Sequence, residues 1–337
     1  MTAPRLAGVH AMADLADDWP ENRQTCVDVL CGYLRMPYTR DPGQEAPESE
    51  RGPFEAIREI RHTVIQVIAA HLKDGAAVSW QGLNFDFTGV VFDGGDFGGA
   101  RFSGGDVSFD RAEFSSGEVS FGGAVFSGGR VHFSGSGFSG GIVDFGGAVF
   151  SGSEVDFGGA VFSGGRVHFS GSGFSGGTVD FGNARFSGGD VSFDRAEFSG
   201  GLVGSVYGQV FFVSAEFTGG QIYFAGAEFS GGTVHFADAE FSGTTVSFGG
   251  AMFSGGWVHF NEALFSSGQV SFDRAEFSGA MVSFGGAVFS GSEVDFGSAV
   301  FSGGRVDFAR ARQWSHPPMF RGGRQTPGGG SATCSAV

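Results

Sequence analysis

The sequence predicts a mainly β fold, in which a β-solenoid follows a small α-helical segment. Three observations support this prediction. Phenylalanines recur from Phe102 to Phe308 with gaps that alternate between seven and five residues, so the period is twelve. Most of the 63 glycines and 41 phenylalanines follow this period, and periodic apolar residues can build a core where aperiodic glycine cannot. Helical spacing of apolar residues, in contrast, is confined to about the first 80 residues.

The first 80 residues are expected to form three short helices, over residues 5–16, about 20–34 and about 54–73. The segment from Met36 to Pro53 holds four of the nine prolines and is expected to be a mobile loop. The predicted apolar stripes comprise Leu6, Val9, Met12 and Leu15; Cys26, Val29, Leu30, Tyr33 and Leu34; and Phe54, Ile57, Ile60, Val64, Val67, Ile68 and Leu72. Three helices bury too little surface to be a convincing domain, so we expect them to pack on the end of the solenoid.

Each twelve-residue period contains two apolar pairs, exemplified by Ala112-Glu113-Phe114 and Val119-Ser120-Phe121. Alternation over three residues predicts a very short strand with both apolar side chains on one face. The strands are linked alternately by two residues, such as Gly122-Gly123, and by four, such as Ser127-Gly128-Gly129-Arg130. Glycine accepts the positive φ of tight corners, so the chain is expected to turn at each link with its apolar pairs inward.

This pattern resembles the pentapeptide-repeat family over residues 83–308. Phe92, Phe97 and Phe102 are spaced by plain fives, with Gly95 and Ala100 two residues before the last two. The resemblance implies a right-handed, four-sided β-helix, although every other face here has two extra residues. Residues 5–34 also resemble the helical segment that precedes the repeats in bacterial, especially actinobacterial, members. Many of those members have transmembrane helices before that segment, which implies membrane association as an alternative to a soluble chain that begins at the helical segment.

A four-faced coil would use 24 residues, so residues 83–308 would make about nine coils in a rod roughly 45 Å long. One segment breaks the count, because seven extra residues lie near Gly204–Val210. Two interpretations stay open. The insertion is either a tolerated bulge or extra face, or a protruding loop that contacts a partner. After Phe308, Trp314 and Phe320 are candidates to cover the open end of the last coil. We therefore divide the chain into a helical cap region (1–80), a repeat domain (81–308), and an end cap with a disordered tail (309–337).

The net charge of −16 is concentrated in the repeat, where residues 81–308 contain 24 acidic and 8 basic residues. Such a rod repels nucleic acid and anionic membranes and attracts a protein with a basic groove. Three cysteines (Cys26, Cys31 and Cys334) do not form a disulfide framework, and Cys26 and Cys31 are expected to be small core residues. We find no signal peptide and no stretch of about 20 apolar residues, so a cytoplasmic location is expected.

Four histidines precede phenylalanines, at His132, His168, His235 and His259. In a 24-residue coil, His132 would lie beside Asp156 and Asp180, and His168 beside Asp144. Such a ladder could hold a metal or an acid–base pair, but Ser108, Ser120 and Ser192 occupy the same position, which favours an outward polar site. The pairs Asp110-Arg111, Asp194-Arg195 and Asp273-Arg274, which recur in copies of Phe-Asp-Arg-Ala-Glu-Phe, are interpreted either as neighbouring charges on solvated corners or as the result of recent duplication.

The glycine pairs match neither a phosphate loop, which needs Gly-Lys-Ser/Thr, nor a calcium-binding β-roll, which has a nine-residue period. We assign no catalytic, cofactor-binding or metal-binding residue and expect no cofactor and no enzyme activity. The first hypothesis is a structural or protein-interaction solenoid of unknown partner. The second, implied by the resemblance, is an acidic DNA mimic that binds a type II topoisomerase such as gyrase, with a homodimer formed through one solenoid end. A polysaccharide-cleaving β-helix is the third.

Overall fold

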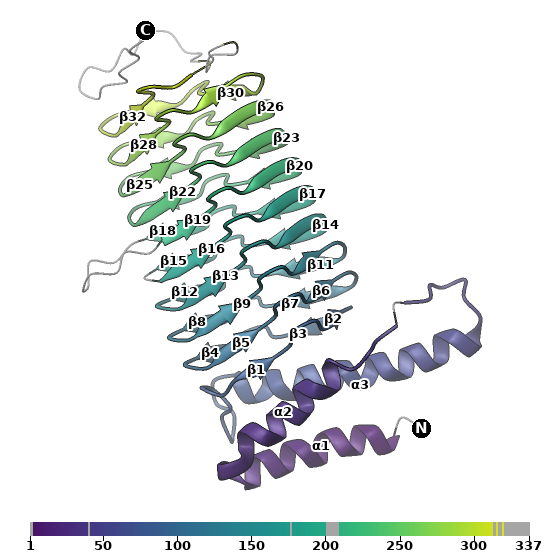
Figure 1. The fold of residues 1–337 in the computed structure, drawn as a ribbon. Coiled ribbons are helices and arrows are strands. Elements are labelled where there is room, and N and C mark those ends of the chain that lie inside the picture. The colour runs from purple at the N-terminus through teal and green to yellow at the C-terminus, as the bar shows by residue number, and fades with distance from the viewer. Residues whose placement is uncertain are drawn as a thin grey trace.

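The computed structural model describes residues 3–39, 41–175, 177–199 and 209–312, together with residues 315 and 319. It confirms the predicted fold, a parallel β-solenoid of about nine turns with three α-helices at its N-terminal end (Figure 1). The helical segments are α1 (Ala3–Asp18), a 3-10 turn (Pro20–Asn22), α2 (Arg23–Leu34) and α3 (Glu48–Leu72).

The helices agree with the prediction in number but differ in detail. α3 begins at Glu48, so the predicted loop ends six residues before Pro53, and that proline lies inside the helix. Leu15 and Val29, placed in the apolar stripes, are 43% and 50% exposed. Most of the other stripe residues are buried or packed against one continuous core that runs from the helices into the coils. The helices therefore cap the solenoid, as expected of a unit too small to bury its own core.

Three parallel sheets form the solenoid. Sheet A contains β1 (Phe85–Asp86), β5 (Asp106–Ser108), β9 (Arg130–His132), β13 (Glu154–Asp156), β16 (Thr178–Asp180), β19 (Gln209–Phe211), β22 (Thr233–His235), β25 (Trp257–His259), β28 (Met281–Ser283) and β32 (Arg305–Asp307). Sheet C contains β4 (Arg101–Ser103), β8 (Val125–Ser127), β12 (Val149–Ser151), β15 (Gly173–Ser175), β18 (Glu197–Ser199), β21 (Glu228–Phe229), β24 (Met252–Phe253), β27 (Glu276–Phe277) and β31 (Val300–Phe301).

Sheet B covers two faces of each coil. It contains β2 (Val91–Phe92), β3 (Gly95–Asp96), β6 (Glu113–Phe114), β7 (Glu118–Ser120), β10 (Gly137–Phe138), β11 (Ile142–Asp144), β14 (Val161–His168), β17 (Arg185–Ser192), β20 (Glu216–Tyr223), β23 (Glu240–Ser247), β26 (Leu264–Ser271), β29 (Val288–Phe289) and β30 (Glu293–Asp295). In five coils, from β14 to β26, the four-residue link pairs with its neighbours, and the two faces join into one eight-residue strand.

The register confirms a coil of 24 residues. Val107 pairs with Val131, and Phe138 pairs with Phe162. Across the insertion the offset becomes 31, because Val179 pairs with Val210. The seven extra residues thus leave the stacking of the coils on either side unchanged. Most of the inserted segment, residues 200–208, lies outside the described residues, as do Trp314 and Phe320, so those two predictions stay open.

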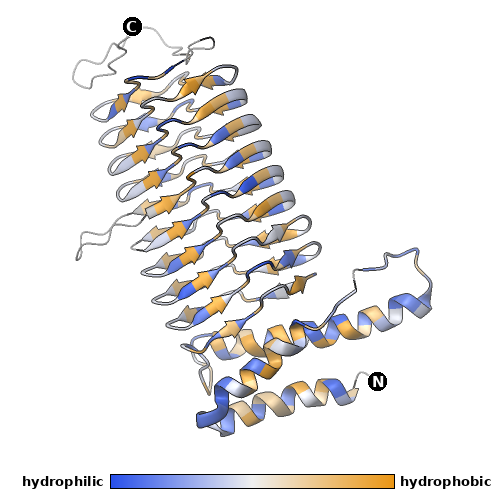
Figure 2. Cartoon of the chain, in the orientation of Figure 1, coloured by the Kyte–Doolittle hydropathy of each residue, from blue (hydrophilic) through white to orange (hydrophobic). Residues whose placement is uncertain are grey.

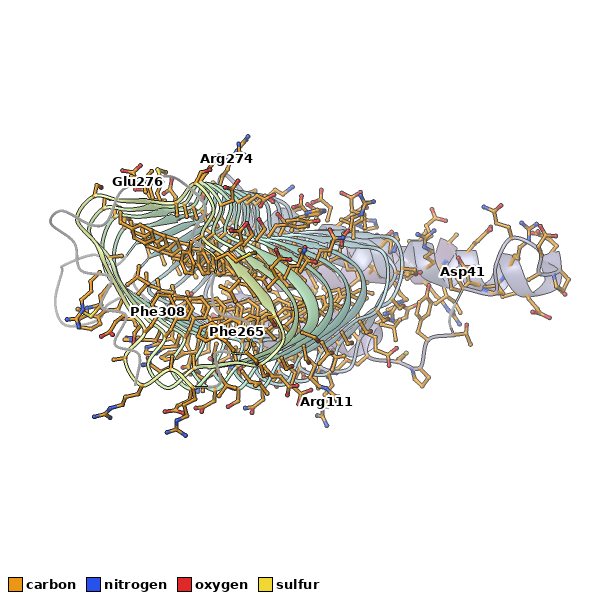
Figure 3. The ribbon with its side chains drawn as sticks, turned by 90° about the horizontal axis from the view of Figure 1, so that it is seen from above. Asp41, Arg111, Phe265, Arg274, Glu276 and Phe308 are labelled. Atoms are coloured by element: carbon orange, nitrogen blue, oxygen red, sulfur yellow. The ribbon has the colours of Figure 1, made fainter. Side chains whose placement is uncertain are left out.

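The core consists of four columns of phenylalanine, one for each face of the coil. Neighbouring rings in a column are stacked, with centroids 4.6 Å apart for Phe109 and Phe133 and again for Phe133 and Phe157. Rings from opposite faces meet edge to face, as do Phe133 and Phe145 at 5.7 Å. Figure 3, a view from above, shows Phe265 and Phe308 inside the ring of strands. Figure 2 shows apolar and polar residues alternating along each strand, as the inward pairs require.

Candidate functional site: the cap junction and the outward ladders

The first coil is shortened where α3 packs against it. Only Asp93 and Gly94 separate Phe92 of β2 from Gly95 of β3, whereas four residues separate the equivalent Phe114 and Val119 of the next coil. A Cβ atom on Gly94 would lie 3.0 Å from His62 Cε1, and one on Gly95 would lie 3.0 Å from Ile65 Cδ1. Both glycines also have positive φ, of 141° and 147°. The plain five-residue spacing near Phe97 therefore makes room for the helix.

Asp93 is the buried charge at this junction, and three side chains satisfy it. Tyr38 donates its hydroxyl to Oδ2 at 2.7 Å, and His62 Nε2 lies 3.1 Å from Oδ1. Arg58 Nε lies 3.1 Å from Oδ2, and its guanidinium also donates to the Asp93 carbonyl at 3.1 Å. Burial by itself raises the pKa of Asp93, but the hydrogen bonds from His62 and Tyr38 outweigh it and hold the pKa below its ordinary value.

Arg61 supports the same junction from the next turn of α3. It is buried and donates to the carbonyls of Leu34 at 2.6 Å and Val91 at 2.8 Å, so it joins α2 to the first coil. Its guanidinium lies 4.2 Å from the centroid of the Tyr38 ring. Burial lowers the pKa of Arg61 and raises that of Tyr38, to which the hydrogen bond with Asp93 adds. The hydrogen bonds of this group hold the cap on the first coil.

A second buried contact fastens the other end of α3. Trp80 is fully buried and donates its indole N–H to Asp17 Oδ1 at 2.8 Å. His71 stacks on Trp80, with ring centroids 4.0 Å apart, and its Nε2 lies 3.1 Å from Asp17 Oδ2. The contact joins α1, α3 and the segment that enters the first coil. The sequence suggested neither group of contacts, because most of these contacts join residues that are 27 or more positions apart.

The predicted histidine ladder is present. His132 pairs with Asp156, which in turn pairs with Asp180, and Asp144 pairs with His168. These residues lie at outward positions of sheets A and B, where their side chains are partly exposed. Among the described residues no three His, Cys, Asp or Glu side chains are grouped so that they could hold a metal ion. The ladder is therefore a row of polar residues on the outer surface.

The recurring Asp-Arg pairs lie at two-residue corners, as predicted. Arg111, Arg195 and Arg274 each occupy the left-handed region, with φ between 54° and 57°. Figure 3 shows Arg111 and Arg274 pointing away from the ring of strands at its two edges. Asp273 and Arg274 form an exposed ion pair at 3.0 Å, a kind of contact that contributes little to stability.

No helix within the described part of the chain is both long enough and apolar enough to cross a membrane. Cys26 and Cys31 are buried and unpaired, in keeping with the predicted core role. A scan against protein-family models gave no match, and a search of curated protein sequences also gave none. What the geometry itself supports is a parallel β-solenoid with regularly spaced phenylalanines, which is compatible with a pentapeptide-repeat-like fold.

Proposed function

We propose that this chain is a non-catalytic scaffold that binds another protein through the outer faces of its solenoid. One observation carries the proposal: the inward positions repeat from coil to coil, whereas the outward positions vary more, with some residues repeated and others replaced. Phe133, Phe157 and Phe181 follow one another in the core, while the residues before them are His132, Asp156 and Asp180. Repetition is required for packing, and variation along a rigid surface is what recognition of a partner requires.

We further propose that the chain is a member of the pentapeptide-repeat family and works in the cytoplasm. The inward pair on every face and the plain fives of the first coil support the family assignment. The two extra residues on alternate faces are a departure that the fold accommodates through the glycine-rich four-residue corners. No catalytic group or cofactor is part of this proposal, in which Asp93 and its partners Tyr38, His62 and Arg58 hold the cap on the first coil.

Affinity capture with the full chain tests this function. The purified protein, immobilised through its C-terminus, is exposed to extract from its own host, and bound proteins are identified by mass spectrometry. We expect a small set of proteins that is absent from a control support carrying an unrelated acidic protein of similar charge. Recovery of the same proteins on both supports would refute specific binding, and turnover of a substrate by the pure chain would refute the non-catalytic assignment.

The alternative, an acidic DNA mimic for gyrase, has one observation in its favour. Like-charged residues are paired in register on neighbouring strands: Asp156 with Asp180, Glu197 with Glu228, and Glu216 with Glu240. Burial raises the pKa of Asp180, and the nearby charges of Asp156 and Glu154 add to this effect. A net charge of −16 over a rod of roughly 45 Å is about one charge per 3 Å, against about one per 1.7 Å in duplex DNA. The scaffold is therefore our first proposal.

A supercoiling assay separates the two. The mimic should inhibit gyrase at micromolar concentration, and the inhibition should weaken as salt rises, because the contact is between charges. Replacing Glu216 and Glu240 by Gln should reduce the inhibition, whereas replacing the buried Ser153 by Ala should not. Absence of inhibition at micromolar protein would eliminate the mimic and leave the scaffold. A homodimer through a solenoid end belongs to the same alternative and can be measured by light scattering.

A further inference from the structure

One part of sheet A differs from the rest of the outer surface. From β5 to β16 its outward residues include Asp106, Arg130, Glu154, Asp156 and Asp180. The next four strands, β19, β22, β25 and β28, contain no Asp, Glu, Lys or Arg at all. Charge returns at β32. On sheet A, an uncharged stretch four coils long therefore lies between charged strands.

Aromatic residues and a methionine occupy this stretch. Phe211, His235 and His259 form an outward stack, with ring centroids 4.9 Å and 5.0 Å apart. Trp257 lies against His259 at 5.6 Å and is 48% exposed, and Met281 pairs with it on the next strand. We call these five residues the aromatic face. Tryptophan, other aromatic residues and methionine are enriched where proteins bind one another, and a tryptophan held by a neighbouring ring loses little freedom on binding.

Acidic residues border the aromatic face. Asp180 precedes it on β16, and Asp238 and Glu262 are exposed at the corners that follow β22 and β25. The face covers four strands, about 14 Å along the axis, and one strand of three residues, about 10 Å, across it. This area is too small for the interface of two globular proteins, which takes about 800 Å² from each partner, but it suits a short segment.

We propose that the aromatic face is the docking site for a protein segment that presents an apolar anchor flanked by lysine or arginine. The inference rests on the proposed scaffold function and adds the surface and the chemistry of the partner. Trp257, His259 and Met281 receive the anchor, and Asp180, Asp238 and Glu262 attract the flanking basic side chains. A second copy of this chain fits poorly, because each copy has a net charge of −16, and nucleic acid is repelled by the same charge.

Selection from a random library of 12-residue peptides tests the inference. The intact protein is the bait, and the peptides obtained should combine Trp, Phe, Leu or Met with Lys or Arg. Their affinity should fall at least tenfold for the double variant Trp257→Ser/Met281→Ser. It should be unchanged for Met252→Ser/Val300→Ser, a control that removes two side chains of sheet C that are 42% and 48% exposed. Replacing Asp238 and Glu262 by Asn and Gln should weaken binding and make it less sensitive to salt.

The outcomes separate this inference from the proposed function. Thermal melts of both double variants should match the wild type, so a loss of binding is not a loss of folding. If no peptide is enriched, or if peptides bind equally well without Trp257 and Met281, the inference is wrong. The scaffold function survives that result if the host proteins captured by the wild type are still captured by the double variant. A dimer that disappears in the double variant would show a second copy on this face and would also overturn the proposal.

Discussion

The inward and outward residues of the same strands follow opposite rules. In sheet A, Phe133, Phe157 and Phe181 form a uniform column, whereas their neighbours His132 and Asp156 differ from coil to coil. A phenylalanine in the column is covered on both sides by identical rings, so any change leaves a cavity. An outward residue has water on one side and tolerates replacement. The twelve-residue repeat is therefore the requirement of the core, and evidence of function has to be sought where the repeat varies.

The largest difference between inward and outward residues is expected for Phe157→Ala. The ring is fully buried between Phe133 and Phe181, with centroid distances of 4.6 and 4.7 Å, so its loss should cost about 3–5 kcal/mol of unfolding free energy. The neighbouring change Asp156→Ser should cost about 1 kcal/mol, because it removes the acceptor of the Ser134 hydroxyl and keeps an acceptor for the Gly158 N–H. Urea denaturation followed by circular dichroism measures both. Equal effects would mean that the column is not the basis of stability.

Asp93 is an exception to the pattern of apolar buried residues, because it is a charged residue buried at a corner against Tyr38 and Arg58 of the cap. Asp93→Asn should cost about 2–3 kcal/mol, because it removes charge-assisted contacts with Arg58 and His62. The pKa of Asp93 is lowered in the fold, so its contribution is present above its unfolded pKa of about 3.9 and is lost as the pH falls below that value. Hydrogen exchange of α3 from pH 5 to pH 3 should show this loss in the wild type. If the variant shows the same pH dependence, the carboxylate is not the fastening of the cap.

The four-residue and two-residue corners are expected to differ in the cost of replacing a glycine by alanine. A Cβ atom on Gly129, in a four-residue corner, would lie 2.3 Å from the Gly105 carbonyl oxygen of the coil before. Gly129→Ala should therefore cost about 1–3 kcal/mol through a backbone clash. Gly123, in a two-residue corner, has positive φ but open space around its Cα, and Gly123→Ala should cost about 1 kcal/mol. Arg111 already occupies an equivalent position. A larger loss at Gly123 than at Gly129 in thermal melts would contradict this assignment.

The smallest effect is expected from the half-buried pair His235 and His259. Burial lowers the pKa of both imidazoles, and the neighbouring His259 adds to the effect on His235. The unfolded chain therefore binds protons more readily, and stability should fall as the pH drops from about 6.5 towards the lower folded values. Replacing both histidines by Gln should reduce the loss of unfolding free energy between pH 7 and pH 5 by a fraction of a kcal/mol. An unchanged slope between pH 7 and pH 5 in chemical denaturation would remove the pair as its source.

The sequence predicted the periodic part of the molecule well and the unique contacts poorly. The coil length, the inward pairs and the histidine ladder follow from spacing alone, because each coil copies the one before. The start of α3 at Glu48 was missed because Pro53 was interpreted as its boundary, although a proline near the first turns does not exclude a helix. Asp93 could not be assigned, because its partners Tyr38, Arg58 and His62 are brought together only by the packing of the cap.

The aromatic face shows the same limit on the outer surface. The sequence places His235 and His259 in a polar ladder, but nothing in their spacing connects them with Trp257 and Met281. Trp257 occupies a different position in the repeat, and only the register of β22, β25 and β28 places all of them on one surface. The one available signal was the absence of charge in four segments that recur about every 24 residues, namely Gln209–Phe211, Thr233–His235, Trp257–His259 and Met281–Ser283.

Deletion of single coils tests most directly whether the inward residues fold the chain and the outward residues give it function. Removing residues 133–156 joins His132 to Phe157, and removing 236–259 joins His235 to Phe260, so both deletions keep the inward pattern. Since the stability of a solenoid is nearly the sum of its repeats and their interfaces, both variants should fold with similarly lowered melting temperatures. Only the second, which lacks Trp257 and His259, should lose affinity for the selected peptides, by at least tenfold. Equal affinity of the two variants would contradict the separation of core and binding surface.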